Sequence, residues 1–288
     1  MKMGRSRVWA VVEGVHHDTP YYEGLLVDGA GVGSVEFLQA SDFEVDGVSS
    51  GGKSHALKVL EALDAVNGLS QENKETKIDV VIFVDRDDDE YINAIVEHAH
   101  LHYTAASDVE AEIIYQSNLP QAVARAFSIP RADAIEIYSR TPEPARALAN
   151  AWSEWIAMRL ASVECEWSDT RFAQASQINV PKYGPVDRAR VVSICSRVRA
   201  QVQSWDVMVL DASLHVSEMI RRGNAHQLVK GKWLAPYIIQ DIKAQFAGTR
   251  QLPAVSSAQI LTACLMTIDF AQVWTRSYKT RMEPVLSR

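Results

Sequence analysis

The sequence predicts an α/β protein, in which a mostly parallel sheet flanked by helices is followed by a mainly helical C-terminal domain. Up to about residue 118, short apolar runs alternate with amphipathic stretches, which is typical of a parallel sheet covered by helices. From residue 119 onward, helical periodicity dominates and prolines separate the segments. The expected domains are therefore residues 1–118 and residues 119–288.

Four strands and four helices are expected in the first domain. The strands are runs of β-branched and apolar residues, at residues 8–14, 34–40, 78–85 and 101–104. The helices show amphipathic spacing or a capping residue, at residues 18–26, 54–66, 89–101 and 107–116. Asp18 would cap the first of these helices, and Ser107 or Asp108 would cap the last.

Six helices are expected in the second domain, where apolar residues recur at helical spacing between prolines. They cover residues 120–129, 144–164, 187–205, 216–223, 235–248 and 257–278. The sequence therefore predicts that the second domain is predominantly helical.

The composition is that of an ordinary globular protein, with 47% apolar and 23% charged residues. No uninterrupted apolar run approaches the roughly 20 residues that a membrane span requires. Cys165, Cys195 and Cys264 are far apart and lack the close pairing of zinc or disulfide motifs. These features predict a cytoplasmic protein with no membrane partner.

The charge is distributed unevenly between the two expected domains. Residues 1–118 carry 8 Lys and Arg against 22 Asp and Glu, whereas residues 119–288 carry 21 against 14. An acidic half joined to a basic half suits a metal-dependent enzyme that acts on a polyanion. Two differently solvated modules would give the same asymmetry, so this feature alone leaves the function open.

Carboxylates stand at the ends of two of the predicted strands, at residues 8–14 and 78–85. Glu13 ends one apolar run, Asp85 and Asp87 end another, and Glu110 lies in a later acidic segment. Side chains at the carboxyl ends of parallel strands point into the crevice where ligands bind. Several acids in one crevice repel each other unless a divalent cation is present. The sequence therefore predicts a hard metal ion, Mg²⁺, with Mn²⁺ as a possible substitute.

Four segments of the first domain together carry a family resemblance. They read VVEGVHHDTPYY at residues 11–22, SGGKSHALKVL at 50–60, FVDRDDD at 83–89 and SDVEAEII at 107–114. In this order they resemble the Toprim domain, the metal-dependent fold of topoisomerases, primases and several nucleases. Within it the chain is similar to the OLD-like phage-defence nucleases, and above all to the effector nucleases of the PARIS anti-phage system. The resemblance covers about residues 7–118.

This resemblance implies a role for each acidic residue. Glu13 would be the acid–base carboxylate, and Asp85 and Asp87 would hold Mg²⁺. Glu110, with Asp108 nearby, would complete a second metal position. Carboxylates suit this chemistry because hard cations take oxygen ligands, and a bound metal ion offsets phosphate charge and activates water.

The resemblance also implies a phosphate contact at the start of a helix. Gly52, Lys53 and Ser54 come just before or at the beginning of the helix expected at 54–66. Backbone N–H groups at a helix N-terminus, together with one lysine, can hold a phosphate of the nucleic acid.

A basic cluster with an aromatic residue stands in the second domain. It contains Arg221, Arg222, Lys230, Lys232 and Trp233. Such a cluster suits contacts to backbone phosphates. Because OLD-type relatives use a lysine beyond the acidic motifs, Lys232 is the candidate for stabilising the transition state, with Lys230 as the alternative. A basic surface loop that caps a helix remains the other interpretation.

The family likeness implies a Mg²⁺-dependent endonuclease that acts as a toxic effector in anti-phage defence. RNA, with tRNA as a plausible target, is the implied substrate, and DNA is possible. The likeness also implies an ABC-type ATPase partner that holds the nuclease inactive, and a homodimer as the active form.

Two other functions compete with this interpretation. Residues 47–54, GVSSGGKS, match the phosphate-binding loop G-x-x-x-x-G-K-[ST], and Asp85 could then hold Mg²⁺ for a nucleotide hydrolase. That pattern leaves Glu13 and Asp87 without roles. A non-catalytic module that binds nucleic acid is the second alternative.

Overall fold

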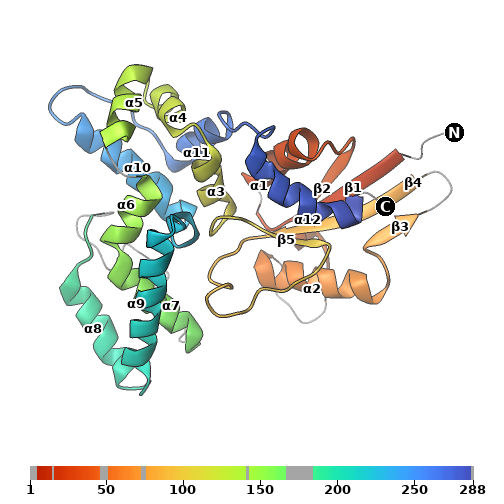
Figure 1. Cartoon of the computed structure of the whole chain (residues 1–288), viewed down its shortest axis with the longest axis horizontal. Helices are drawn as coiled ribbons and strands as arrows, with labels where there is room; N and C mark the ends of the chain where they lie inside the picture. Colours follow the sequence, from red (N-terminus) through yellow and green to blue (C-terminus); the bar gives the residue numbers. More distant parts are fainter. Residues whose placement is uncertain are drawn as a thin grey trace. The chain divides into compact units, whose positions relative to one another are not determined.

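The computed structural model in Figure 1 describes residues 5–14, 16–45, 51–72, 76–140, 143–166 and 184–286. The chain divides into two units: unit 1 contains residues 1–86, 95–105 and 268–288, and unit 2 contains residues 87–94 and 106–267. This division differs from the boundary expected after residue 118. Residues 106–118 belong to unit 2, and the C-terminal segment returns to unit 1.

Unit 1 is built on a mostly parallel sheet, which confirms the predicted α/β class. Its strands are β1 (Arg5–Val12), β2 (Val35–Gln39), β3 (Ser70–Glu72), β4 (Thr76–Val84) and β5 (Leu101–Tyr103). The order is β2-β1-β4-β3, and β5 also pairs with β4. All pairs are parallel except the pair of β3 with β4. Since β1 and β4 lie inside this order, their carboxyl ends are flanked by other strands.

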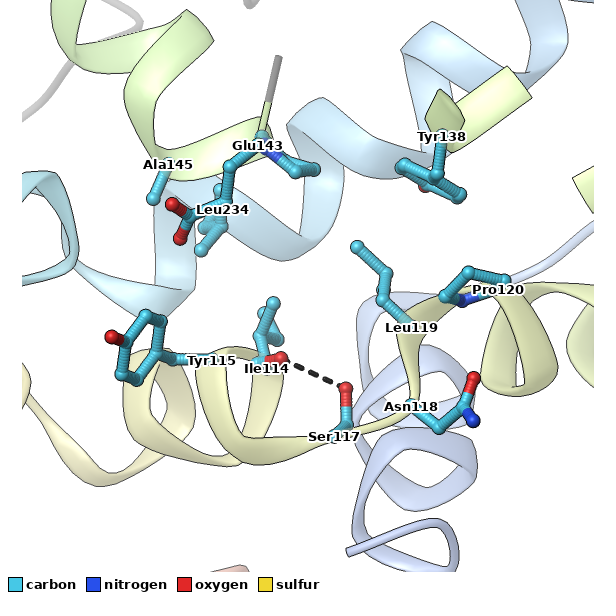
Figure 2. Close-up of a pocket in the computed structure, with 11 residues that line it drawn as sticks. Ile114, Tyr115, Ser117, Asn118, Leu119, Pro120, Tyr138, Glu143, Ala145 and Leu234 are labelled. Atoms are coloured by element: carbon cyan, nitrogen blue, oxygen red, sulfur yellow. Dashed lines mark hydrogen bonds between the residues drawn. The ribbon is translucent and has the colours of Figure 1, made fainter. Parts of the chain in front are cut away.

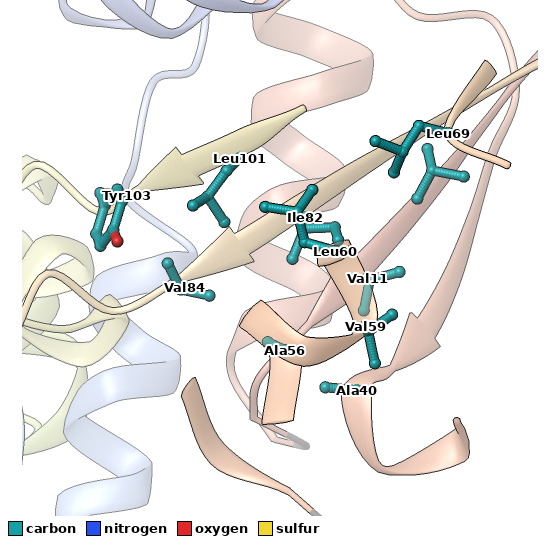
Figure 3. Close-up of a cluster of buried hydrophobic side chains, with 11 residues drawn as sticks. Val11, Ala40, Ala56, Val59, Leu60, Leu69, Ile82, Val84, Leu101 and Tyr103 are labelled. Carbon is teal, nitrogen blue, oxygen red and sulfur yellow. The ribbon is translucent and has the colours of Figure 1, made fainter. Parts of the chain in front are cut away.

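Helices cover both faces of this sheet. They are α1 (Asp18–Glu23), continued by the π-helix η1 (Gly24–Gly29), then η2 (Ala40–Asp42), α2 (Gly52–Ala65), η6 (Val273–Thr275) and α12 (Arg276–Leu286). Val59 and Leu60 of α2 pack in one buried cluster with Ile82 of β4 (Figure 3). The next residue of β4, Phe83, points to the opposite face and stacks on Tyr22 of α1 with ring centroids 4.0 Å apart. The alternation of apolar residues along β4 therefore supplies both faces of the core.

The prediction of a helix at residues 89–101 is wrong, because this segment forms turns and a loop before β5. Asn93 has a positive φ of 54°, which interrupts any helix. Tyr91 donates a hydrogen bond to Glu164 over 3.0 Å and packs on His215, both in unit 2. His100 contacts the backbone oxygen of Val80 at 2.6 Å. Contacts with distant segments thus replace the local helix.

Unit 2 is helical in its described residues, and this confirms the predicted helical C-terminal region. Its elements are α3 (Val109–Gln116), α4 (Leu119–Ala126), α5 (Arg131–Arg140), α6 (Pro144–Ala151), α7 (Ser153–Glu164), α8 (Arg188–Arg199), α9 (Trp205–Arg221), η5 (Ala225–Gln227), α10 (Gly231–Gln245) and α11 (Ser257–Leu265). Several boundaries differ from the expected ones. The helix expected at 144–164 is divided at Trp152, and the one expected at 257–278 ends at Leu265. Helix α5 was not expected.

The core of unit 2 contains three tryptophans in edge-to-face contact. The ring of Trp155 lies 5.3 Å from that of Trp152 and 4.9 Å from that of Trp233. All three side chains are buried, so the aromatic residues of α7 and α10 serve the core. None of the helices in the described part of the chain is long and apolar enough to cross a membrane.

Candidate active site

At the carboxyl edge of the unit 1 sheet, where the sequence predicts a crevice, Glu13 lies close to the backbone of Asp85. Glu13 follows β1 and Asp85 follows β4, and these neighbouring parallel strands pair with Val11 opposite Ile82. The backbone N–H of Asp85 donates to Oε2 of Glu13 over 3.4 Å. Both residues are half-buried. Two of the acidic residues singled out in the sequence thus meet at one sheet edge.

The turn after Glu13 is closed by Asp18. The backbone N–H of Gly14 donates to the Asp18 carboxylate over 2.8 Å. A Cβ on Gly14 would lie 2.5 Å from Oδ1 of Asp18, so a larger residue there would displace this carboxylate. The expectation that Asp18 caps α1 is wrong, because the N-cap is His17 and Asp18 is already helical. Its carboxylate instead fixes the loop that carries Glu13.

Lys53, in the first turn of α2, reaches the end of β4. Its Nζ donates to the backbone oxygens of Asp85 and Arg86 over 3.0 Å and 3.4 Å. A Cβ on Gly52 would lie 4.0 Å from Oε1 of Glu13. The positive N-terminus of α2 and the Lys53 ammonium therefore lie at the same sheet edge as Glu13.

The phosphate-binding pattern is only partly described. Residues 46–50, which include Gly47, lie outside the described residues. Gly51 and Gly52 have φ values of 102° and 74°, conformations that glycine adopts without strain. Ser54, the last residue of the pattern, is exposed.

Asp87 belongs to unit 2 and forms an ion pair there. Its φ is 48°, and its backbone N–H donates to Ser107 over 2.7 Å. Nζ of Lys230 donates to Oδ1 of Asp87 over 2.5 Å. Both side chains are partly buried, so this pair is less screened than one at the surface. Lys230, a candidate phosphate contact, therefore compensates an acidic residue in this structure.

Asp108 links the N-termini of two helices. Its Oδ1 accepts from the backbone N–H of Ala111, over 2.8 Å, as the N-cap of α3. Both carboxylate oxygens also accept from the N–H of Gly231, the first residue of α10, over 2.9 Å and 3.0 Å. Burial, and then the nearby Glu110, raise the pKa of Asp108 to about 7. The side chain proposed as a metal ligand thus has a structural role as a double cap.

We expect Asp108→Asn to reduce the pH dependence of stability. The folded pKa of about 7 is above the ordinary 3.8, so the protonated form stabilises the fold at low pH and this stabilisation is lost as pH rises through about 7. At about 1.4 kcal/mol for each pKa unit, the loss is on the order of 4 kcal/mol. Asparagine keeps an oxygen for both N–H groups but does not titrate.

Urea unfolding at pH values between the ordinary pKa of 3.8 and the folded pKa of about 7, without added divalent metal, measures this pH dependence of stability. The free energy of unfolding of the wild type should fall toward neutral pH more steeply than that of Asp108→Asn. Asp28→Asn, at an exposed side chain, serves as the control and should follow the wild type. Parallel pH profiles for Asp108→Asn and the wild type would contradict the assignment.

A buried arginine that the sequence did not single out holds Asp88. Arg159 of α7 donates to Asp88, and its side chain is only 5% exposed. The guanidinium lies over the Trp233 ring at 5.3 Å from the centroid, and Nζ of Lys232 lies 5.7 Å from the same centroid. Partial burial, and then the charge of Lys230, lower the pKa of Lys232. For the ion pair between Arg159 and Asp88, the one signal in the sequence was an arginine within the apolar residues of α7.

Arg221 and Arg222 lie at the exposed end of α9. Both pair with Glu218, with N–O distances of 2.6 Å. These exposed pairs contribute little to stability. The arrangement leaves guanidinium groups on the surface, as a contact to a polyanion requires.

The backbone oxygens of Asp85 and Arg86 accept from the Lys53 ammonium, so the carboxylates of Glu13 and Asp85 are the groups of unit 1 that could hold a cation. Mg²⁺ takes one or two carboxylates together with water and phosphate oxygens. Across the described residues, no group of three or more His, Cys, Asp or Glu side chains is arranged to hold a metal ion. The expected ligands Asp87, Asp108 and Glu110 belong to unit 2.

No protein-family model and no curated protein matches this chain.

Proposed function

We propose that the protein is a Mg²⁺-dependent nuclease that hydrolyses phosphodiester bonds, with Glu13 and Asp85 in its catalytic crevice. The observation that carries the proposal is the hydrogen bond from the backbone of Asp85 to the Glu13 carboxylate, at the ends of two neighbouring parallel strands. Open α/β sheets bind their ligands at this edge. A carboxylate there can act as a cation ligand or as a proton acceptor.

Each residue of the crevice has a chemical role in this proposal. Bound Mg²⁺ would supply charge compensation for the phosphate and an activated water. Glu13 accepts the proton of the attacking water, since its carboxylate is half-buried and already faces the end of β4. Asp85 provides the cation ligand. Lys53 fixes the carbonyl groups of Asp85 and Arg86 and adds positive charge near the phosphate.

In this proposal unit 2 supplies the basic residues that bind the polyanion. Lys232 is the candidate for stabilising the transition state and Lys230 is the alternative, although Lys230 pairs with Asp87 in this structure. Arg221 and Arg222 contribute exposed positive charge. Asp87 and Glu110, with Asp108, remain candidate metal ligands on sequence grounds.

The biological role proposed here rests on the resemblance to OLD-like phage-defence nucleases. In this role the chain is a toxic effector that cleaves RNA, with tRNA favoured over DNA. It acts as a homodimer, and an ABC-type ATPase holds it inactive. Expression of the wild-type chain alone should then arrest bacterial growth. Growth unaffected by expression of the folded chain would contradict this role.

Incubation of the purified full chain with total RNA and with plasmid DNA, in Mg²⁺ or in excess chelator, tests the nuclease activity. We expect cleavage of one substrate that requires Mg²⁺ and is restored by Mn²⁺. Salt-sensitive binding with no cleavage at any metal concentration would instead support the non-catalytic module.

The described residues favour the nuclease over a nucleotide hydrolase. In a phosphate-binding loop, a strand leads directly into the glycine-rich segment. Here β2 ends at Gln39, and η2 follows before the pattern begins at Gly47. ATP hydrolysis by the purified chain that is lost in Lys53→Met would nevertheless establish the hydrolase.

A further inference from the structure

A pocket lies entirely within unit 2, among α3, α4, α5, α6 and α10 (Figure 2). Its volume is about 340 Å³, which is within the range of small-molecule sites. None of the residues assigned to the proposed nuclease lines it. We call it the α3–α6 pocket.

The walls of this pocket are mainly apolar. Ile114, Leu119 and Leu234 contribute aliphatic side chains from three different helices. The Tyr115 ring is held against the imidazole of His226, with centroids 3.9 Å apart. Apolar walls on packed helices form a preorganised surface for the body of a ligand.

The polar side chains of the described lining differ in their hydrogen bonding. Ser117 donates to the backbone oxygen of Ile114 over 2.8 Å (Figure 2), and Asn118 accepts from the N–H of Gln121 as the cap of α4. Within the described part of the chain, the Tyr138 hydroxyl is buried and has no hydrogen-bond partner. The Glu143 carboxylate likewise has no hydrogen bond or ion pair there, and Figure 2 shows it near Tyr115 and Ala145.

The electrostatics of the pocket are negative. Glu143 is the one charged residue in the described lining. Burial raises the pKa of Glu143, and the charge of Arg146 offsets this only in part. Burial also raises the pKa of Asp241, which acts electrostatically on Tyr138. A cation in the pocket would stabilise the charged form of the Glu143 carboxylate.

We propose that the α3–α6 pocket binds a small organic cation, with its apolar body against Ile114, Leu119 and Leu234 and its ammonium group at Glu143. The Tyr115 face provides further attraction for the cation. The Tyr138 hydroxyl adds a donor for a polar atom of the ligand. Neutral and anionic molecules of the same shape lack the interaction with Glu143.

Phenethylamine, phenethyl alcohol and hydrocinnamate test this proposal, because they share an aromatic body and differ in charge. They are titrated into the full chain at neutral pH and followed by ligand-observed NMR and calorimetry. We expect saturable binding that is tightest for phenethylamine. Glu143→Gln should lower the affinity for phenethylamine by about fivefold, the effect expected for a partly exposed ion pair. The affinity for phenethyl alcohol should not change.

Two further variants make the result specific. Leu119→Trp should fill the pocket and abolish binding of every probe. Glu154→Gln changes an exposed glutamate outside the pocket and should bind like the wild type. The proposal is overturned by the absence of saturable phenethylamine binding to the folded wild type, by equal affinity for all three probes, or by unchanged affinity in Glu143→Gln. Circular dichroism of each variant verifies its fold.

Discussion

Glu13→Gln should reduce nucleic-acid cleavage by about 10²- to 10⁴-fold, which is the usual contribution of an acid–base group. Glutamine has the shape of glutamate but neither accepts a proton nor carries the charge that a cation requires. It keeps an oxygen that can accept the N–H of Asp85, now bound to Glu13 over 3.4 Å. The free energy of unfolding should therefore change by less than about 1 kcal/mol. Initial rates of cleavage at saturating Mg²⁺ measure the loss.

Two companion variants decide what this loss means. Asp85→Asn removes the other carboxylate of the crevice and should cause a loss of similar size. Glu72→Gln is a matched change on the exposed strand β3 of the same unit and should leave the rate unchanged. If both crevice variants retain wild-type cleavage, Glu13 and Asp85 are not the catalytic carboxylates and the proposed nuclease site is wrong.

The meeting of Glu13 with the end of β4 could be predicted from sequence because it depends on local patterns. Strands β1 and β4 are apolar runs, and each is followed directly by an acidic residue. Parallel neighbours place such ends at one edge of a sheet. The parallel pairing of β1 with β4 then brings Glu13 to Asp85.

The helix expected at 89–101 failed because its conformation depends on contacts that are distant in sequence. The segment has apolar residues at helical spacing, but Tyr91 is held by Glu164 and His215. His100, farther along, contacts Val80 of β4. No window of a dozen residues contains these partners, so periodicity alone favoured a helix.

The domain boundary and the partners of the basic residues depend on similar long-range contacts. Helix α3 follows the sheet in sequence, yet the cap of α3, Asp108, also binds the first N–H of α10. Lys230 is 143 residues from its partner Asp87. The sequence identified the residue types that bear charge, but it could not show which charges are paired within the fold.

Gly231→Ala should destabilise unit 2 by forcing two helices apart. A Cβ at this position would lie 2.2 Å from Cβ of Glu110 and 2.6 Å from the backbone nitrogen of Ala111. Since backbone atoms of α3 cannot turn aside as a flexible side chain can, α10 must move away from α3. The movement would also break the hydrogen bonds between Gly231 and Asp108.

We expect Gly231→Ala to lower the free energy of unfolding by about 3 kcal/mol, the upper part of the range for overpacked sites. This corresponds to a fall in melting temperature of roughly 6–12 °C for a chain of this size. Gly33→Ala is the matched control, because no atom lies within 4 Å of a Cβ at Gly33. Equal melting temperatures for the two variants would show that α10 does not approach α3 at Gly231. A lower melting temperature in Gly231→Ala alone would mean that glycine is required at this position for the Asp108 carboxylate to join α3 and α10. This contact would then also hold Lys230 and Lys232 in place at the start of α10.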